Sequence, residues 1–228
     1  MSLIYGLNQL ISDASDYIEQ ISTGEQISVE VNLKDENETV TLQINEGITV
    51  QNGSHSPDAR ILMNKTVFDK ILTGEADFGA LIGRSKYSDK RPIDFEIINT
   101  NKTNQIMTRL YNLMTVFFTP GKPKIKKLTR SLAGDAHGAH PIPLVYGDGI
   151  RSGWYTIDPG ETLNESGEKD PYPQLFVVIK GRGEAQIGDT RITLEPDSAI
   201  YIPLNTSHSI TALKTMQLLW LAWNTPIM

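Results

Sequence analysis

The sequence predicts two domains of different fold class. An α+β domain, with an antiparallel sheet and helices, is expected over residues 1–118, and an all-β barrel over residues 137–228. Two observations support this. Helical and alternating apolar patterns are mixed in the first part, whereas the last part holds short apolar runs separated by Gly, Pro and Asp turns. A basic stretch lies between them. A chain of 228 residues is long enough for two modest domains.

The N-terminal part begins with an amphipathic helix and continues as strands. Apolar residues recur at helical spacing over residues 2–22. The period then changes to two and predicts four half-buried strands, over 27–33, 40–44, 48–50 and 59–63, joined by DENE, NEG and NGSHSPD turns. Asn64 is a candidate N-cap for a short helix that ends at Gly74. A second short helix, a strand around Phe95 and a last helix near Phe117 complete the order.

This order of elements, with ILMNKTVFDKILTGEADFGALIGRSKYSDKRPIDFEI at its centre, resembles the sterol-carrier-protein-2 (SCP2) family over roughly residues 20–118. The specific elements are Asp58 before a strand, the helix ending in ILTGE, the short helix ending at Gly83 and the final amphipathic helix. The resemblance implies a tunnel for an acyl chain, sterol or similar lipid, held by burial at about 0.8 kcal/mol per methylene. The expected pocket residues are Phe68, Ile71, Phe78, Leu81, Leu110, Met114 and Phe117. The same residues would also make a solid core, and the sequence leaves both alternatives open.

Residues 119–136, TPGKPKIKKLTRSLAGDA, form a basic linker or extended arm, because Pro120 and Pro123 cannot continue a helix. A basic run of this kind either contacts phosphate or is a solvated connector, and the second alternative is favoured.

Composition narrows the class of protein. The net charge of −6 argues against broad binding to nucleic acid or to anionic membranes. The absence of cysteine excludes disulfides, thiolate zinc sites and cysteine nucleophiles. The N-terminal residues lack the pattern of a signal peptide, and no apolar run reaches the 18 residues of a membrane span. We therefore expect a cytoplasmic protein without stable membrane anchoring.

The C-terminal part reads as about eight short strands: PIPLVYG, GWYTID, QLFVVIKG, EAQIG, RITL, AIYIP, HSITAL and MQLLWLAW. So many short strands need closure to avoid exposed edges, which favours a small barrel. Gly181 and Gly183 are interpreted as a hairpin turn between two of them. The last run is apolar on both faces, so one face is expected inside the barrel and the other against a partner subunit or the N-terminal domain. A homodimer is the expected assembly.

Four segments of this part together resemble the two motifs of the cupin family: the PGE turn, the apolar strand ending at Gly181, the IGD turn and IPLNTSH. The resemblance implies a jelly-roll barrel and dimerisation through it. In that family the first motif supplies two His and a Glu to a metal, and the second supplies a third His. By the resemblance, the Glu position falls on Gln174 and the two His positions on Asp170 and Glu168. The second-motif His is His208.

Several other family positions differ in this chain. Asp197 and Asn205 stand where glycines are usual, and Asn tolerates positive φ. The closing Asn of the second motif is Ala212. These departures are compatible with the barrel fold, but they weaken the interpretation of the barrel as an enzyme.

The candidate metal ligands are therefore His208, Gln174, Asp170 and Glu168. Carboxylates with one His suit Mn or Fe, and Ni and Zn also remain candidates. The competing interpretation places Glu168 and Asp170 in a solvated loop, NESGEKDPYP, and makes His208 a hydrogen-bonding residue. His137 and His140, in GDAHGAHPIP, are alternative ligands if they reach the barrel mouth. The residues expected to line the barrel pocket are Trp154, Thr156, Phe176, Val178, Tyr201 and Trp220.

Three functions are consistent with these expectations. The leading one is a non-catalytic binding protein, in which the SCP2-like part holds an apolar ligand or lipid and the barrel binds a small molecule, dimerises the chain, or both. The alternative is a metal-dependent isomerase, lyase or dioxygenase with the SCP2-like part as substrate carrier. The third is a barrel that serves only as an assembly platform.

Overall fold

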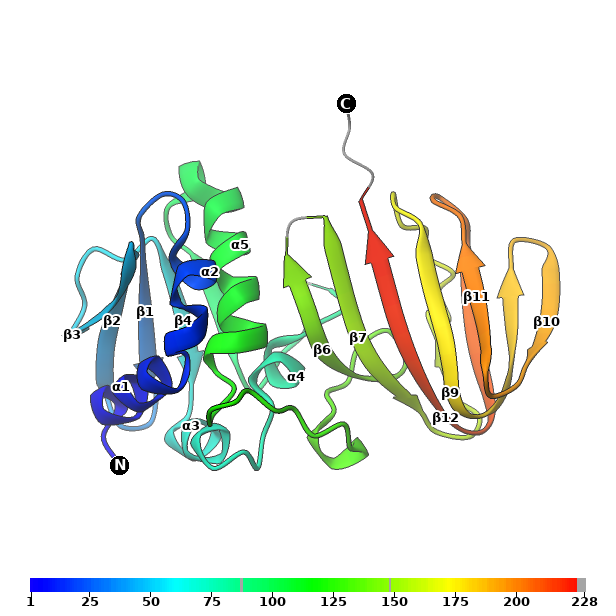
Figure 1. The fold of residues 1–228 in the computed structure, drawn as a ribbon, viewed down its shortest axis with the longest axis horizontal. Helices are drawn as coiled ribbons and strands as arrows, with labels where there is room; N and C mark the ends of the chain where they lie inside the picture. The colour runs from blue at the N-terminus through cyan, green and yellow to red at the C-terminus, as the bar shows by residue number, and fades with distance from the viewer. Residues whose placement is uncertain (87, 148, 225–228) are drawn as a thin grey trace. The chain divides into compact units, whose positions relative to one another are not determined.

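The structure, a computed structural model, describes residues 1–86, 88–147 and 149–224 (Figure 1). The chain forms two compact units: Met1–Ile82 with Lys90–Lys127, and Gly83–Asp89 with Leu128–Met228. The basic stretch 119–136 is thus divided between the units after Lys127. The segment 83–89 was expected within the first domain, and it packs with the second unit.

The first unit is built on a five-stranded sheet of order β3-β2-β1-β4-β5. The strands are β1 (Ile27–Leu33), β2 (Glu38–Asn45), β3 (Gly47–Asn52), β4 (Ala59–Met63) and β5 (Asp94–Ile97). The four strands predicted between residues 27 and 63 are therefore present. The expectation of a fully antiparallel sheet is wrong at one place, because β1 and β4 pair in parallel, with Val29 opposite Ala59.

The parallel pair results from the NGSHSPD segment, which crosses the polar face of the sheet from β3 to the far side of β1. Thr41 Oγ1 on β2 donates a hydrogen bond to the Gly53 carbonyl (2.7 Å), and Ser54 Oγ donates to Glu30 on β1 (2.5 Å). Asp58 N then donates to the Ser28 carbonyl (2.8 Å). These bonds explain why Thr41, Glu30 and Ser28 are buried although they are polar.

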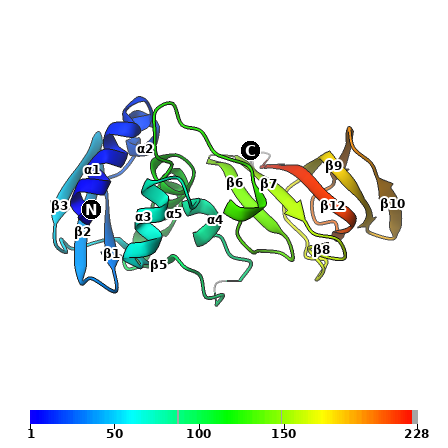
Figure 2. The same ribbon diagram turned by 90° about the horizontal axis from the view of Figure 1, so that it is seen from below.

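Helices cover the apolar face of this sheet, where α1 and α2 pack on β2 and β3 and α5 packs on β1 (Figures 1 and 2). The helical elements are α1 (Leu3–Asp13), η1 (Ser15–Tyr17), α2 (Ile18–Ser22), α3 (Lys65–Leu72), α4 (Phe78–Ile82), η2 (Thr100–Lys102), α5 (Thr103–Asn112) and the π-helix η3 (Leu113–Phe117). The single helix predicted over 2–22 is interrupted at Ala14. Asn64 precedes α3 as expected but makes no side-chain cap, and Asp35 accepts from Lys65 N instead (2.8 Å).

The second unit contains a seven-stranded sheet in which β10, β9, β12, β7 and β6 are successive neighbours, while β11 pairs with β9 and β8 with β12. Its elements are η4 (Arg130–Leu132), β6 (His140–Gly147), β7 (Ile150–Ile157), β8 (Thr162–Leu163), β9 (Gln174–Ile187), β10 (Thr190–Leu194), β11 (Ser198–Ile202) and β12 (His208–Trp223). The hydrophobic interior combines residues of these strands, among them Ile157, Phe176 and Leu218.

Two pairs of predicted strands are single long strands. QLFVVIKG and EAQIG form β9, and HSITAL and MQLLWLAW form β12, with register shifts between Ala212 and Leu218. The hairpin turn expected at Gly181 and Gly183 is therefore wrong. Gly181 has φ +87, and a Cβ there would lie 2.1 Å from the Thr215 carbonyl oxygen, so the glycine lets β9 bend closely against β12. Both halves of each strand thus belong to one barrel wall.

The backbone confirms one expectation from the cupin motifs. Asp197 and Asn205 have φ values of 63° and 55°, at the two positions where glycine is usual in the family. Within the part of the chain that the structure describes, no helix is long and apolar enough to cross a membrane.

Candidate functional site

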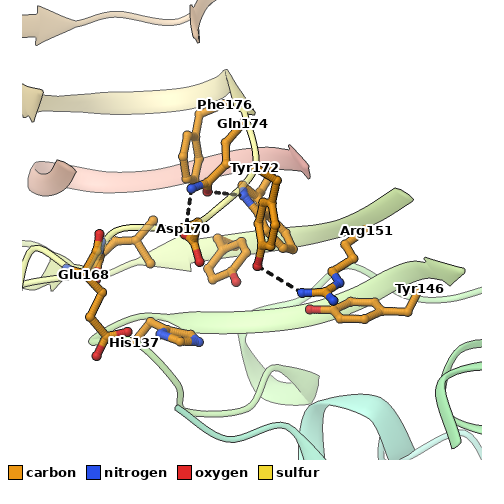
Figure 3. Close-up of a pocket in the computed structure, with 12 residues that line it drawn as sticks. His137, Tyr146, Arg151, Glu168, Asp170, Tyr172, Gln174 and Phe176 are labelled. Carbon is orange, nitrogen blue, oxygen red and sulfur yellow. Dashed lines mark hydrogen bonds between the residues drawn. The ribbon is translucent and has the colours of Figure 1, made fainter. Parts of the chain in front are cut away.

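The barrel unit contains a pocket of about 160 Å³ (Figure 3). Residues of β6, β7, β8, β9 and β12 contribute to it, together with residues 164–172 between β8 and β9 and one histidine that precedes β6. Its lining residues are His137, Tyr146, Arg151, Tyr155, Leu163, Asn164, Glu168, Asp170, Tyr172, Gln174, Phe176 and Trp220.

Aromatic side chains form the inner wall of the pocket because they lie on the inward face of adjacent strands. Phe176 on β9 is directly opposite Trp220 on β12. On β7, Gly153 pairs with Trp220, and a Cβ at Gly153 would come within 3.7 Å of the indole. The ring of Tyr155 meets the indole edge-to-face at 6.1 Å. The wall is consequently apolar and tightly packed.

Gln174 lies at the centre of a hydrogen-bonded chain in this wall. Trp220 Nε1 donates to Gln174 Oε1 (2.7 Å), and Gln174 Nε2 donates to Asp170 Oδ2 (2.7 Å). Gln174 is only 3% exposed. An amide can accept from an indole and donate to a carboxylate at the same time, whereas a carboxylate at this position can only accept. The Asp170 charge is thus stabilised from inside the barrel by a neutral residue.

Arg151 and Tyr172 form a second polar group at another part of the pocket (Figure 3). Arg151 Nη1 donates to the Tyr172 hydroxyl at 3.0 Å, and its guanidinium carbon lies 5.1 Å from the centre of the ring. Burial raises the pKa of Tyr172, and Asp170 raises it further, against the effect of Arg151. Burial also raises the pKa of Tyr155. Both tyrosines therefore present neutral hydroxyls at neutral pH.

The loop between β8 and β9 is held in place by Asn164, which has φ 56° and is 8% exposed. Its amide nitrogen donates to the carbonyls of Glu168 (3.1 Å) and His208 (2.9 Å), and its amide oxygen accepts from Glu168 N (3.2 Å). Its backbone nitrogen donates to the His137 carbonyl (2.7 Å). One buried side chain thereby fixes the loop to β12 and to the segment of His137.

The predicted metal ligands are only partly brought together. Glu168, Asp170 and Gln174 line the pocket, but His208 is not among its lining residues. His208 is 4% exposed, with its ring centre 5.9 Å from that of Phe176 and its Nδ1 3.3 Å from the Thr206 carbonyl oxygen. Burial lowers its pKa, although Thr206 and Asp170 act in the opposite direction. Because Gln174 is already bonded to Trp220 and Asp170, the residues at the motif positions do not fit a metal centre as they stand.

The two alternative histidines lie in different places. His137 lines the pocket with Glu168 and Asp170, whereas His140 bonds to Asp135 and Glu161. Among the residues that the structure describes, one group of three potential ligands has its ligand atoms within 4.8 Å of one another. It consists of His140, Asp158 and Glu161. Glu168, Asp170 and His208 do not form such a group. Of the two alternative histidines, His137 therefore lines the pocket and His140 does not.

The residues expected to line the barrel pocket are also divided. Phe176 and Trp220 line it, and Val178 belongs to the barrel interior. Trp154 and Thr156 are buried but alternate with Tyr155, so they lie on the opposite face of β7, and Tyr201 is 68% exposed. Sequence reasoning missed Tyr146, Arg151, Tyr155, Leu163, Asn164 and Tyr172. Strand alternation would have found Tyr155 only if the inward face of β7 had been known.

The residues expected to line a lipid pocket lie in the interior of the first unit. All are buried except Leu81, which is partly exposed. The rings of Phe78 and Phe118 stack at 4.0 Å, and those of Phe117 and Phe118 meet edge-to-face at 5.0 Å. A separate surface pocket in this unit has polar walls, with Gln26, Gln43 and Gln51 among its lining residues.

Comparison with known proteins identifies part of the chain. The family model described as a cupin domain matches residues 153–224. Among solved structures, a Cupin 2 conserved barrel domain protein from Salinispora arenicola is 17% identical, with a TM-score of 0.40, over 44% of this chain and 88% of that one. A cupin superfamily protein from Desulfitobacterium hafniense is 16% identical, with a TM-score of 0.38, over 45% and 93%. No curated protein matches the sequence significantly. The second unit of the chain thus carries a cupin domain, at residues 153–224.

Proposed function

We propose that the cupin barrel binds a small organic molecule non-catalytically. A cavity of about 150 Å³ is large enough for a molecule the size of benzene, and the pocket here has a similar volume, about 160 Å³. Trp220, Phe176 and Tyr155 offer apolar surface to such a ring. The ligand class that fits is a single-ring molecule with one anionic group and one hydrogen-bond donor.

The polar side chains of the pocket support this ligand class. Arg151, with the hydroxyls of Tyr146 and Tyr172 nearby, favours a carboxylate or a similar acceptor. The carboxylates of Asp170 and Glu168, which also line the pocket, favour a hydrogen-bond donor. A ligand with both groups would be oriented as well as bound.

The observation that carries the proposal is the placement of Gln174 between Trp220 and Asp170. These bonds satisfy the residue that stands at the family's metal-ligand position without any ion. The polar wall is therefore fixed before a ligand enters, which reduces the entropy lost on binding.

A thermal-shift panel tests the proposal, with benzoate, aniline and 4-aminobenzoate as probes of the full chain. We expect benzoate and 4-aminobenzoate to raise the Tm, and the effect to disappear in Arg151→Met. Arg191→Met removes an exposed arginine of β10, outside the pocket, and should leave the effect intact. If neither carboxylate stabilises the protein, or if both variants respond like the wild type, the proposal fails.

The alternative is a metal-dependent cupin enzyme, and one observation favours it. His137 lines the same pocket as Glu168 and Asp170, so nitrogen and oxygen donors face one cavity. Elemental analysis of Mn, Fe, Ni and Zn in purified protein tests this function. One equivalent of metal that is lost in Asp170→Asn would support the enzyme and argue against the binding protein.

A homodimer through the cupin domain is a further proposal. Leu219 and Leu221 of β12 lie beside Val177 and Leu175 of β9, on the sheet face opposite Trp220, and Tyr201 of β11 extends this face. All five side chains are partly or fully exposed, which favours coverage by a second copy. Sedimentation equilibrium should give a dimer for the wild type and a monomer for Leu219→Glu. A monomeric wild type would exclude it.

For the first unit we propose an apolar ligand, supported by the buried apolar residues and by the SCP2 resemblance of the sequence. The contact between the rings of Phe78 and Phe118 favours a filled core instead. Extraction of the purified full chain with organic solvent, followed by mass spectrometry, distinguishes the two. A stoichiometric lipid supports the carrier function, and protein free of lipid supports the solid core.

A further inference from the structure

A second cluster of ligating side chains lies outside the pocket, where the turn after β7 meets the start of β6. His140 is the first residue of β6 and is 6% exposed. Asp158 and Glu161 belong to the Asp-Pro-Gly-Glu turn between β7 and β8. Glu161 N donates to the Asp158 carbonyl (3.0 Å), and Asp158 N donates to Glu161 Oε2 (2.8 Å). These two bonds hold both carboxylates beside the histidine.

The spacing of these groups matches that of ligands around one metal ion. His140 Nε2 lies 2.9 Å from Glu161 Oε2 and 3.6 Å from Asp158 Oδ2. Two ligand atoms at about 2.0–2.2 Å from a zinc ion are separated by about 3–3.6 Å when the angle at the metal is between 90° and tetrahedral. The three side chains would therefore need only small movements to share an ion.

The hydrogen bonds of His140 show which ring nitrogen would face a metal. Nδ1 lies 2.7 Å from Asp135 Oδ1 and 3.3 Å from the Gly134 carbonyl oxygen, and both of these atoms can only accept. Nε2 lies 2.9 Å from Nη2 of Arg130, which can only donate, and 2.9 Å from Glu161 Oε2, which can only accept. The imidazole therefore carries a proton on Nδ1, and Nε2, on the side of the carboxylates, is the nitrogen that would bind a metal. A carboxylate behind Nδ1 orients many metal-binding histidines in the same way.

Arg130 supplies the positive charge at the centre of this cluster. Its Nη2 contacts His140 Nε2 at 2.9 Å, and its Nε donates to Asp158 Oδ2 at 3.1 Å. Without a cation, the carboxylates of Asp158 and Glu161 would repel one another. The Arg130 side chain is 48% exposed and begins in the short helix η4, so it can move aside into solvent.

We propose that His140, Asp158 and Glu161 bind a divalent transition metal that displaces Arg130, with Asp135 as the positioning residue behind His140. Zn²⁺ accepts an imidazole nitrogen and carboxylate oxygens as ligands, as do Mn²⁺ and Fe²⁺, while Ca²⁺ requires six to eight oxygen ligands. The metal would join the start of β6 to the turn after β7. Because His137 lies just before β6, metal binding would stabilise one wall of the pocket.

Isothermal titration of the full chain with Zn²⁺ tests the proposal. We expect one zinc per chain, with binding weakened at least about tenfold in Glu161→Gln, and also about tenfold in Asp135→Asn through loss of the orienting carboxylate. Arg130→Ala should bind zinc about tenfold more tightly, because the competing cation is removed. A purely structural ion-pair network would instead give a less stable Arg130→Ala variant without tighter binding.

Three controls keep the test specific. Arg182→Ala removes an exposed arginine that pairs with Glu195, and it should not tighten zinc binding. His55→Ala removes an exposed histidine of the first unit and should leave binding unchanged. Asp170→Asn separates this site from the pocket. Binding that survives Glu161→Gln, or that is lost in Asp170→Asn, overturns the proposal.

Discussion

The second unit carries two clusters of potential metal ligands, whose charges are compensated in different ways. The inner cluster consists of the cupin motif positions Glu168, Asp170, Gln174 and His208, and the outer cluster consists of His140, Asp158 and Glu161. In the pocket, Asp170 accepts a hydrogen bond from Gln174, a neutral and almost fully buried side chain. At the outer cluster, the carboxylate of Asp158 is paired with Arg130, a charged and half-exposed side chain. A buried amide cannot be exchanged for an ion without leaving polar groups unsatisfied, whereas an exposed guanidinium can. The partners of a ligating residue therefore decide its role more than its own chemistry does.

The largest effect is expected from removing Trp220, the residue that anchors the inner cluster. Trp220→Ala deletes a large buried side chain and leaves Gln174 Oε1 without its donor. We expect the free energy of unfolding to fall by about 3–5 kcal/mol, measured by urea denaturation. Trp220→Phe retains most of the ring and should lose about half of this. If the two variants lose the same amount, the indole hydrogen bond dominates and the packing argument is wrong.

The next effect tests the loop that carries Glu168 and Asp170. Asn164→Ala removes three side-chain hydrogen bonds, and we expect a loss of about 2–3 kcal/mol in unfolding free energy. Asn164→Asp keeps the acceptor for Glu168 N but places a buried carboxylate oxygen against the carbonyls of Glu168 and His208, so it should lose at least as much. Hydrogen exchange of residues 165–170 is the direct measurement. Unchanged protection in Asn164→Ala would mean that the loop is held by something else.

A smaller effect is expected when position 174 carries a carboxylate, as the Glu of the cupin motif does. Gln174→Glu places a second carboxylate against Asp170 and removes the donor of that bond. We expect a loss of about 1–3 kcal/mol at pH 7, recovered at lower pH as one carboxyl group becomes protonated. Gln186→Glu, on an exposed part of the same strand, is the matched control. A variant as stable as the wild type would show that the amide is not required.

The smallest effect concerns His208, the histidine of the second motif. Burial lowers its pKa, so the folded state binds its proton less readily than the unfolded chain does. Stability from this residue is complete above the unfolded pKa of about 6.5 and is lost as the pH falls through the lower folded pKa. The Tm of the wild type should therefore decrease more between pH 7.5 and 5.5 than that of His208→Gln. The ring of His55 is exposed, so His55→Gln should behave like the wild type. Equal slopes of Tm against pH for all three proteins would show that His208 does not cause the decrease.

Much of the barrel was predictable from the sequence because its strands alternate and its turns need positive φ. Asn205 and Asp197 illustrate this, since each adopts the backbone conformation expected of a usual glycine position. The merging of predicted strands into β9 and β12 was not predictable. Gly181 looks like a turn residue locally, and only its contact with Thr215 across the sheet shows that it permits a bend.

The site was predicted less well, for two physical reasons. β7 is buried on both faces from Ser152 to Ile157, so periodicity cannot tell whether Trp154 or Tyr155 faces inward. The polar NESGEKDPYP segment has the composition of a solvated loop. The bonds that order it come from Asn164 and connect it to His208, far along the chain, and local sequence patterns do not report such contacts.

The metal content of the purified protein tests the difference between the two clusters most directly. Wild type, His208→Ala and Glu161→Gln would be equilibrated with Zn²⁺, desalted and measured by elemental analysis. We expect about one zinc per chain in the wild type and in His208→Ala, and a loss of zinc in Glu161→Gln. Zinc that disappears in His208→Ala and remains in Glu161→Gln would contradict it, because the inner cluster would then be the metal centre.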